Sequence, residues 1–198
     1  MGAAVESAAA TDHRATDTRA RLIDVAVRLF TRNSYAGTSL QMIADDIGFT
    51  KAAIYHHFRS REQLLLAVLE PLLEELAMVV DAAENKRSAS ARADEMLTGY
   101  AALAVRNRGL VGVLAADPSV AAALEQRGDW TQLIERQLSL LADVDPGPAG
   151  KVKAAMVFAG MAAAATGPIS AKVGDEALRS YLIEAGRRTL GVRAPRRP

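Results

Sequence analysis

The stretch that decides the fold is residues 39–58, SLQMIADDIGFTKAAIYHHF. Its apolar residues recur at helical spacing on both sides of Gly48, which predicts a short helix, a tight turn at the glycine and a second helix. Capping residues stand where these helices would begin, with Thr38 or Ser39 before the first and Thr50 before the second. Two short helices joined in this way form a helix-turn-helix, whose second helix can lie in a DNA major groove.

The second of these helices carries a local positive charge. From Thr50 to Arg61 the sequence holds Lys51, Arg59, Arg61 and two histidines but no acidic residue, whereas the whole chain has a formal net charge of only +1. A clustered basic face is typical of a nucleic-acid-binding surface. On this pattern alone, a solvated helix face is the alternative. The residues expected to pack the two helices together are Ile43, Ala44, Ile47, Ile54 and Phe58.

Helices are predicted on both sides of this motif. Upstream, an apolar stripe over residues 22–30 predicts a helix that Asp17 or Thr18 caps. Downstream, a long apolar stripe predicts one helix that begins after Ser60. Pro71 lies inside this stripe, and an interior proline removes a backbone hydrogen bond, so we predict a kink there. The alternative is that two helices meet at Pro71.

The remaining chain also shows only the helical period. Asp117 and Pro118 form a typical helix start, and Asp175 is the expected cap of the last helix. No segment shows a convincing period of two, so the predicted fold class is all-α. The further helices are expected at about residues 96–104, 128–141, 149–166 and 178–190.

Composition excludes several classes of protein. The chain has no cysteine, which excludes disulfides, thiolate zinc sites and iron–sulfur clusters. His56 and His57 are adjacent and point about 100° apart on a helix, so we expect no metal site. No nucleophile elbow, phosphate-binding loop or dinucleotide fingerprint is present, so neither an enzyme nor a cofactor is predicted. The uncharged run 154–171 is broken at Gly167 and Pro168, short of a membrane span, and we expect a cytoplasmic protein without a signal peptide.

Spaced motif elements together point to a family. Residues 21–69 contain Leu29-Phe30, SLQMIA at 39–44, Gly48, YHHF at 55–58 and SREQLL at 60–65. This quarter of the chain resembles the DNA-binding domain of the tetracycline-repressor (TetR) family of bacterial transcription regulators. One departure is the segment Gly37-Thr38-Ser39, because the family's glycine usually sits earlier. Arg61 stands where lysine is commoner in the family.

The resemblance implies a set of DNA contacts. Residues of the first motif helix would contact a phosphate or a base edge, and Lys51, Ala52 and Ala53 would face base edges. Tyr55, His56 and Arg61 would bind phosphates. The start of the second helix at Thr50 would add backbone donors. His57 would either brace the first helix or contact DNA. The complete predicted set is Thr38, Ser39, Gln41, Thr50, Lys51, Ala52, Ala53, Tyr55, His56 and Arg61.

The resemblance also implies a C-terminal helical domain that binds an effector and forms a homodimer. Residues that could line an apolar pocket are Met96, Tyr100, Leu103, Leu114, Trp130, Ile134, Gln137, Phe158 and Met161, with Tyr100, Gln137 and Trp130 as polar handles. Residues expected at the dimer interface are Met156, Val157, Gly160, Leu178, Tyr181 and Leu182. The alternatives are that the pocket residues are ordinary core and that the apolar helix 149–166 is buried within one subunit.

The resulting expectation is a ligand-responsive transcription regulator, most simply a repressor. As a homodimer it would bind a near-palindromic operator and be released by a hydrophobic small molecule. The alternative is a helical carrier of a hydrophobic ligand that does not bind DNA. The expected organisation is a disordered tail (1–17), a helix-turn-helix domain (18–69), an effector-binding and dimerisation domain (70–191) and a disordered basic tail (192–198).

Overall fold

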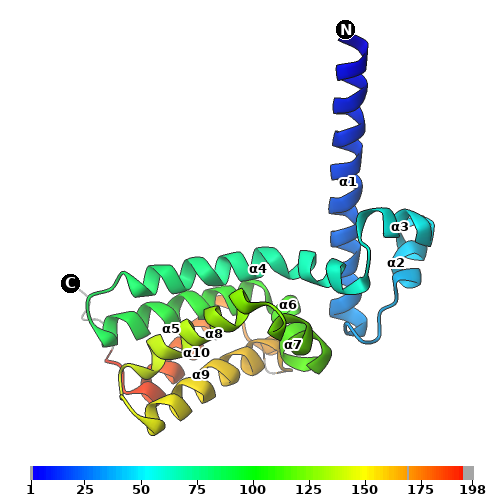
Figure 1. Ribbon diagram of the computed structural model, residues 1–198. Coiled ribbons are helices and arrows are strands. Elements are labelled where there is room, and N and C mark those ends of the chain that lie inside the picture. The colour runs from blue at the N-terminus through cyan, green and yellow to red at the C-terminus, as the bar shows by residue number, and fades with distance from the viewer. Residues whose placement is uncertain (1, 169, 194–198) are drawn as a thin grey trace. The chain divides into compact units, whose positions relative to one another are not determined.

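The computed structural model describes residues 2–168 and 170–193, and in these residues all regular secondary structure is helical (Figure 1). The all-α prediction is therefore confirmed. The chain divides into two compact units, Met1–Glu70 and Pro71–Pro198. The helices are α1 (Gly2–Asn33), α2 (Leu40–Ile47), α3 (Lys51–His57), α4 (Arg61–Glu84), α5 (Ala89–Arg106), α6 (Arg108–Ala116), α7 (Pro118–Glu125), α8 (Gly128–Ala142), α9 (Pro148–Thr166), the short 3₁₀ helix η1 (Ser170–Lys172) and α10 (Asp175–Leu190).

The first helix is longer than the sequence pattern suggested. It begins at Gly2 rather than at the expected caps Asp17 or Thr18, so the segment 1–17 is not the separate tail that was expected. Residues 2–16 include six alanines and no proline, and alanine has the highest helix propensity, so nothing in this segment ends a helix. The basic tail expected at 192–198 lies, from residue 194 on, outside the described residues.

The helix-turn-helix forms as predicted. The Ser39 hydroxyl accepts a hydrogen bond from the Met42 amide at 3.1 Å and caps α2, so Ser39 and not Thr38 is the cap. Gly48 ends α2 in the left-handed conformation, with φ at 73°. Thr50 then caps α3 by accepting from the Ala53 amide at 3.2 Å. These three local devices fix the ends of both helices.

A small apolar core holds the first unit together. Ile43, Ala44 and Ile54 are completely buried, and Phe58 is almost so, as expected; Ile47 is only partly buried. From α1 and the loop after it, Phe30 and Tyr35 pack edge to face with their ring centroids 5.3 Å apart. The buried residues Leu22, Ala26, Leu64 and Leu65 complete this core.

The helix α4 passes through Pro71 without a break, so the alternative of two helices meeting there is wrong. Pro71 is exposed and is the first residue of the second unit. The continuous stripe of buried leucines and valines along α4 explains why the helix persists: burial of its apolar face outweighs the one hydrogen bond that the proline removes.

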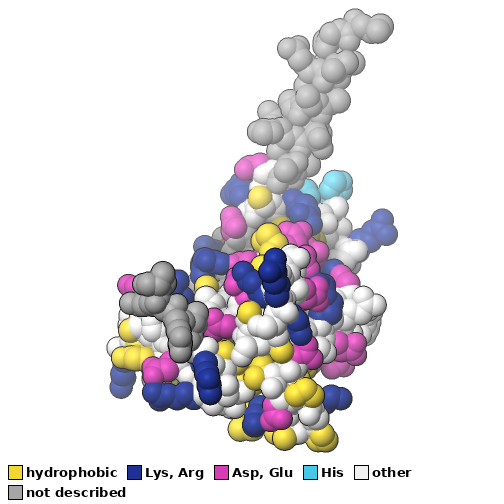
Figure 2. Space-filling view, turned by 90° about the vertical axis from the view of Figure 1, so that its left-hand side faces the viewer, with side chains coloured by type: hydrophobic (Ala, Val, Ile, Leu, Met, Phe, Trp, Pro, Cys, Tyr) yellow, Lys and Arg dark blue, Asp and Glu magenta, His cyan; other side chains and the backbone are white. Residues whose placement is uncertain are grey.

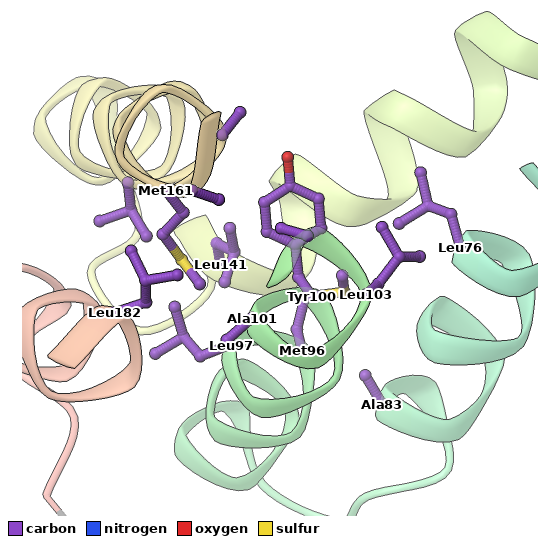
Figure 3. Packing of buried hydrophobic residues seen from close by; sticks show 14 of the residues in the cluster. Leu76, Ala83, Met96, Leu97, Tyr100, Ala101, Leu103, Leu141, Met161 and Leu182 are labelled. Carbon is purple, nitrogen blue, oxygen red and sulfur yellow. The ribbon is translucent and has the colours of Figure 1, made fainter. Parts of the chain in front are cut away.

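The second unit is a bundle in which α5, α8, α9 and α10 pack against one another (Figure 1). Its core includes Met96, Leu97, Leu141, Met161 and Leu182, which meet from these helices in Figure 3. A partly buried ion pair between Arg187 and Asp94 joins α10 to α5, with Nε to carboxylate at 2.5 Å.

Two predicted caps in this unit have different outcomes. Asp117 caps α7 as expected, by accepting from the Ser119 amide at 3.1 Å. Asp175 is instead the first residue of α10, whose cap is Gly174, and its carboxylate accepts a hydrogen bond from Arg108 at 2.6 Å. The Asp175 carboxylate thus pairs with the Arg108 guanidinium and does not cap α10. Among the described helices, none is long and apolar enough to cross a membrane.

Candidate nucleic-acid interface

The exposed face of α3 gathers the candidate DNA-binding side chains. Lys51, Ala52, Tyr55 and His56 are exposed, whereas Ile54 points into the core with no exposed surface. Tyr55 is 45% exposed, although a large aromatic side chain is usually more buried. Helical periodicity therefore sorts α3 into a face that anchors it and a face that is free to contact a partner.

The positive charge of this face is not neutralised by pairing within it. The Lys51 ammonium lies 6.0 Å from the centroid of the Tyr55 ring, a cation–π arrangement that leaves the ammonium accessible. The exposed carboxylates of the preceding helix have partners elsewhere: Asp45 accepts from Gln41 at 2.8 Å, and Asp46 pairs with Arg28. Over the whole face drawn in Figure 2, by contrast, charges of both signs are mixed.

The first motif helix contributes fewer contacts than expected. Ser39 and Gln41 are exposed near its start. Thr38, in contrast, is completely buried, and its hydroxyl donates to the carbonyl oxygens of Ser34 (2.8 Å) and Leu29 (3.2 Å). Its predicted DNA contact is therefore wrong, because the side chain joins the end of α1 to the start of α2.

Arg61 also has an internal role instead of the predicted phosphate contact. Its Nη1 donates to the carbonyl oxygens of Thr38 (2.8 Å) and Tyr35 (3.1 Å) and approaches that of Ala36 at 3.5 Å. The guanidinium stacks on the Tyr35 ring, 4.2 Å from its centroid. A planar cation with several donors is suited to binding converging carbonyl groups. Arg61 thus fixes the loop between α1 and α2.

Three arginines outside the predicted set of DNA contacts lie exposed in the same unit. Arg59 follows α3 directly. From α1, Arg19 and Arg21 stack over the rings of Phe58 and Phe49, at 5.2 Å and 5.7 Å from the centroids. Arg59 could have been identified from the basic stretch in the sequence. Arg19 and Arg21 could not, because they lie more than 25 residues before the aromatic rings that position them.

His57 is half-buried, which agrees better with the bracing role than with a fully exposed contact. Burial is the main cause that lowers its pKa below the ordinary value, and the neighbouring charges of His56 and Arg19 lower it further. The two histidine rings are edge to face, with centroids 5.3 Å apart. No group of three or more possible metal ligands occurs among the described residues.

The second unit contains an apolar cavity of about 440 Å³. Five predicted residues line it: Tyr100, Leu103, Leu114, Trp130 and Phe158. The centroids of the Tyr100 and Phe158 rings lie 4.8 Å apart. The Tyr100 hydroxyl points away from Met96 and Leu97 (Figure 3). Burial raises the pKa of Tyr100 above its ordinary value, so the hydroxyl stays protonated.

The other four predicted pocket residues, Met96, Ile134, Gln137 and Met161, do not line the cavity. Met96, Gln137 and Met161 are buried core residues instead. The sequence also missed Leu72, Leu73 and Leu76 of α4, which line the cavity together with residues of α6, α7 and α9. A helical stripe shows which residues are buried but not which of them border a space, because that depends on the neighbouring helices.

The predicted dimer residues separate into two groups. Val157, Leu178 and Leu182 are buried within the subunit, so their predicted role at an interface is wrong. They pack between α9, α10 and α5. Met156 and Tyr181 are 63% and 60% exposed, and Gly160 is exposed with no side chain within 4 Å of where its Cβ would stand. Only this second group is available to a partner.

The comparisons with known proteins agree with this geometry. Residues 22–68 match the family described as bacterial regulatory proteins, tetR family. HTH-type transcriptional regulator TtgR of Pseudomonas putida is 37% identical over 76 residues, which is 38% of this chain and 36% of TtgR. The uncharacterized HTH-type transcriptional regulator YerO of Bacillus subtilis is 44% identical over 50 residues, 25% of this chain and 17% of YerO. The alignments thus span about a third or less of these relatives.

Solved structures extend the likeness to the second unit as fold alone. The TetR-family regulator PfmR of Thermus thermophilus has a TM-score of 0.67 at 19% identity, over 90% of this chain and 97% of that one. The ketosteroid regulator KstR2 of Mycobacterium tuberculosis has a TM-score of 0.66 at 15% identity, over 88% and 93%.

The fold and the α3 face define a helix-turn-helix protein with a helical second unit. Residues 22–68 match the TetR family of bacterial regulatory proteins, and the fold of the chain resembles that of solved TetR-family regulators. The relatives are transcriptional regulators, a class of protein that is not enzymatic.

Proposed function

We propose that the protein is a cytoplasmic, ligand-responsive transcriptional repressor that binds a near-palindromic operator as a homodimer. In this proposal, residues 18–69 bind DNA and residues 70–191 bind the effector and dimerise. The observation that carries the proposal is the face of α3, on which Lys51, Ala52, Tyr55 and His56 are exposed while Ile54 anchors the helix.

In this proposal, some residues of the α3 face contact bases and others contact phosphates. Lys51, at the start of α3, donates to O6 or N7 of a guanine, and the methyl group of Ala52 packs against a thymine methyl. Tyr55, His56 and the exposed Arg59 bind phosphates, which sets the register of the helix on DNA. With a net charge of only +1, the chain depends on specific fit, and its non-specific affinity for DNA is low.

A homodimer supplies the two recognition helices that a near-palindrome requires. Val152, Met156 and Gly160 are exposed and recur every four residues on α9, so they form one stripe along that helix. The absence of a side chain at Gly160 lets a second helix approach closely. A second copy of the chain covers this stripe, and the two-fold symmetry of such a dimer matches the two half-sites of a near-palindrome.

The effector of the proposed regulator is hydrophobic, because the lining of the 440 Å³ cavity contains no charged side chain. Three cavity residues, Leu72, Leu73 and Leu76, belong to α4, the helix whose first residues form part of the DNA-binding unit. A ligand against these leucines changes the equilibrium between DNA-binding and released states by its different affinity for the two.

A gel shift with DNA fragments that flank the protein's own gene tests the DNA-binding part. The wild type is expected to retard at least one fragment. Lys51→Ala should change the preference at one or two base pairs of an operator library, at a cost of about 1–3 kcal/mol. Lys151→Ala, the same change at an exposed position of α9, is the control and should leave binding unchanged.

The same assay separates the regulator from the alternative function. A protein that binds a hydrophobic ligand but retards none of the fragments would be a carrier, and the proposal would fail. Equal effects of Lys51→Ala on all operator sequences would instead show that Lys51 contacts phosphate and not a base.

A further inference from the structure

Two arginines of α1 are held at the two ends of α3, which α1 passes in Figure 1. The Arg19 guanidinium carbon lies 5.2 Å from the ring centroid of Phe58, the residue that directly follows α3. The Arg21 guanidinium carbon lies 5.7 Å from the ring centroid of Phe49, in the turn before α3. One cation of α1 therefore stands near the beginning of the second motif helix and another near its end.

Helical geometry explains why both arginines stay outside the core. Two residues along an α-helix correspond to a rotation of about 200°, so the side chains of Arg19 and Arg21 leave α1 in different directions. The buried residues Leu22, Ala26 and Leu29 lie on the face between these directions, whereas both arginines are exposed. The arginines thus border, on its two sides, the face by which α1 packs into its unit.

Neither arginine forms an ion pair with a carboxylate in the part of the chain that the structure describes. Arg28, on the same helix, differs in this respect because it pairs with Asp46. Stacking on an aromatic ring occupies only the flat face of a guanidinium, and the N–H donors lie in its plane. Arg19 and Arg21 are therefore positioned by the rings while their donors stay available to an anion.

Positive charge gathers around α3 without a nearby compensating charge in sequence. No acidic residue occurs from Phe49 to Arg61, and this stretch contributes Lys51 and Arg59. At the end of α3, burial lowers the pKa of His57, and the charges of His56 and Arg19 lower it further. Cations that are crowded in this way repel one another, and an anion placed among them relieves the repulsion.

We propose that Arg19 and Arg21 bind phosphates of the DNA backbone beside the base pairs that α3 reads. Phosphates follow both edges of the major groove, so cations held beside a helix in that groove have phosphates within reach. Such contacts carry no sequence information, and they fix how the helix is oriented on the duplex. This inference rests on the proposed DNA binding and extends the interface from the helix-turn-helix to α1.

The experiment measures the affinity for an operator fragment that the wild type retards, by fluorescence anisotropy at several salt concentrations. Arg19→Gln and Arg21→Gln should each reduce the slope of log affinity against log salt by about one for each bound subunit. The loss of affinity should be the same for every member of an operator library, because phosphate contacts do not read the sequence. Arg28→Gln is the matched control. It removes the same charge from the same helix, but Asp46 already pairs with that charge, so the slope should not change.

Lysine variants separate a phosphate contact from a role in packing alone. Lysine keeps the positive charge but lacks the planar group that stacks on a ring. Arg19→Lys and Arg21→Lys should therefore retain the salt slope of the wild type. If the arginines served only to pack against Phe58 and Phe49, lysine and glutamine variants would behave alike.

An unchanged salt slope in Arg19→Gln or in Arg21→Gln would overturn the assignment of that arginine. The proposal as a whole would fail if Arg28→Gln reduced the slope as much, or if the lysine variants matched the glutamine variants. A wild type that retards no DNA fragment would refute the regulator and this inference together. A wild type that binds DNA, with unchanged slopes in both glutamine variants, would refute only this inference and leave the proposed function standing.

Discussion

Arg59 and Arg61 lie two residues apart but differ in what their side chains contact. Arg61 donates to the carbonyl oxygens of the loop before α2 and stacks on Tyr35, whereas Arg59 is exposed just after α3. The sequence resemblance had implied a phosphate contact for Arg61. Of these two arginines Arg59 is the more exposed, so our proposal assigns the phosphate contact to Arg59.

Alanine substitutions at these two positions should therefore have opposite signatures. Arg61→Ala removes charge-assisted hydrogen bonds to backbone carbonyls and should lower the free energy of unfolding by about 2 kcal/mol, without changing the salt dependence of DNA binding. Arg59→Ala should leave stability within about 0.5 kcal/mol and reduce the slope of log affinity against log salt by about one. Urea denaturation and operator titrations at several salt concentrations measure both. If Arg61→Ala instead reduced the salt slope while Arg59→Ala lowered the free energy of unfolding, Arg61 would be the phosphate contact.

His57 predicts a pH dependence of stability. Its folded-state pKa is lowered, first by burial and then by His56 and Arg19, below the ordinary value near 6.5. Between the lowered value and 6.5 the unfolded chain binds a proton that the folded chain resists, so stability is lost as the pH falls through this window. His57→Gln should reduce this loss when urea denaturation is compared at pH 7.0 and pH 5.5. Parallel losses in both proteins would show that other groups cause the acid sensitivity.

At the scale of elements, α4 is the helix that both units share. Pro71, at the boundary, removes a backbone hydrogen bond, and the cavity residues Leu72 and Leu73 follow it directly. In our proposal, a ligand in the cavity would therefore contact α4 directly after the residue that lacks a backbone hydrogen bond. In the proposed mechanism this makes Pro71 a hinge between effector and DNA.

Pro71→Ala should therefore stiffen α4. Without a ligand, we expect the operator affinity to be unchanged. Half-release of the operator should need at least a threefold higher effector concentration, because bending α4 at position 71 now breaks a backbone hydrogen bond. Glu74→Ala, an exposed position on the same helix, is the control and should behave like the wild type. Fluorescence anisotropy of a labelled operator, titrated with effector, measures the release. If release by Pro71→Ala is the same as by the wild type, Pro71 is not the hinge.

At the scale of the whole molecule, two exposed methionines test the dimer. Met156 on the proposed interface and Met78 on α4 are 63% and 64% exposed, so the same substitution changes similar surfaces. Met156→Glu should yield a monomer at concentrations where the wild type is a dimer, because it buries a charge without a partner at the interface. Met78→Glu should remain a dimer. Light scattering after size-exclusion chromatography measures both masses, and a dimer of Met156→Glu would place the interface elsewhere.

Local features were the ones that the sequence predicted best. The cap at Thr50, the glycine at 48 and the buried Ile54 all follow from residue type and helical period, and each is present as predicted. The roles of Thr38 and Arg61 could not be predicted in this way. Both side chains are polar and lie in or beside the helix-turn-helix, and only the folding of the preceding loop against them turns them inward.

The sequence by itself determined that the chain is all-helical and carries a helix-turn-helix whose second helix has basic residues. Such features depend on contacts within a few residues, and so the order of residues encodes them directly. The tertiary structure alone decided which apolar residues border the cavity, which face of α9 stays exposed, and that Gln137 is buried without a partner. These properties arise where helices distant in sequence meet, and helical periodicity says that a face is buried but not against what.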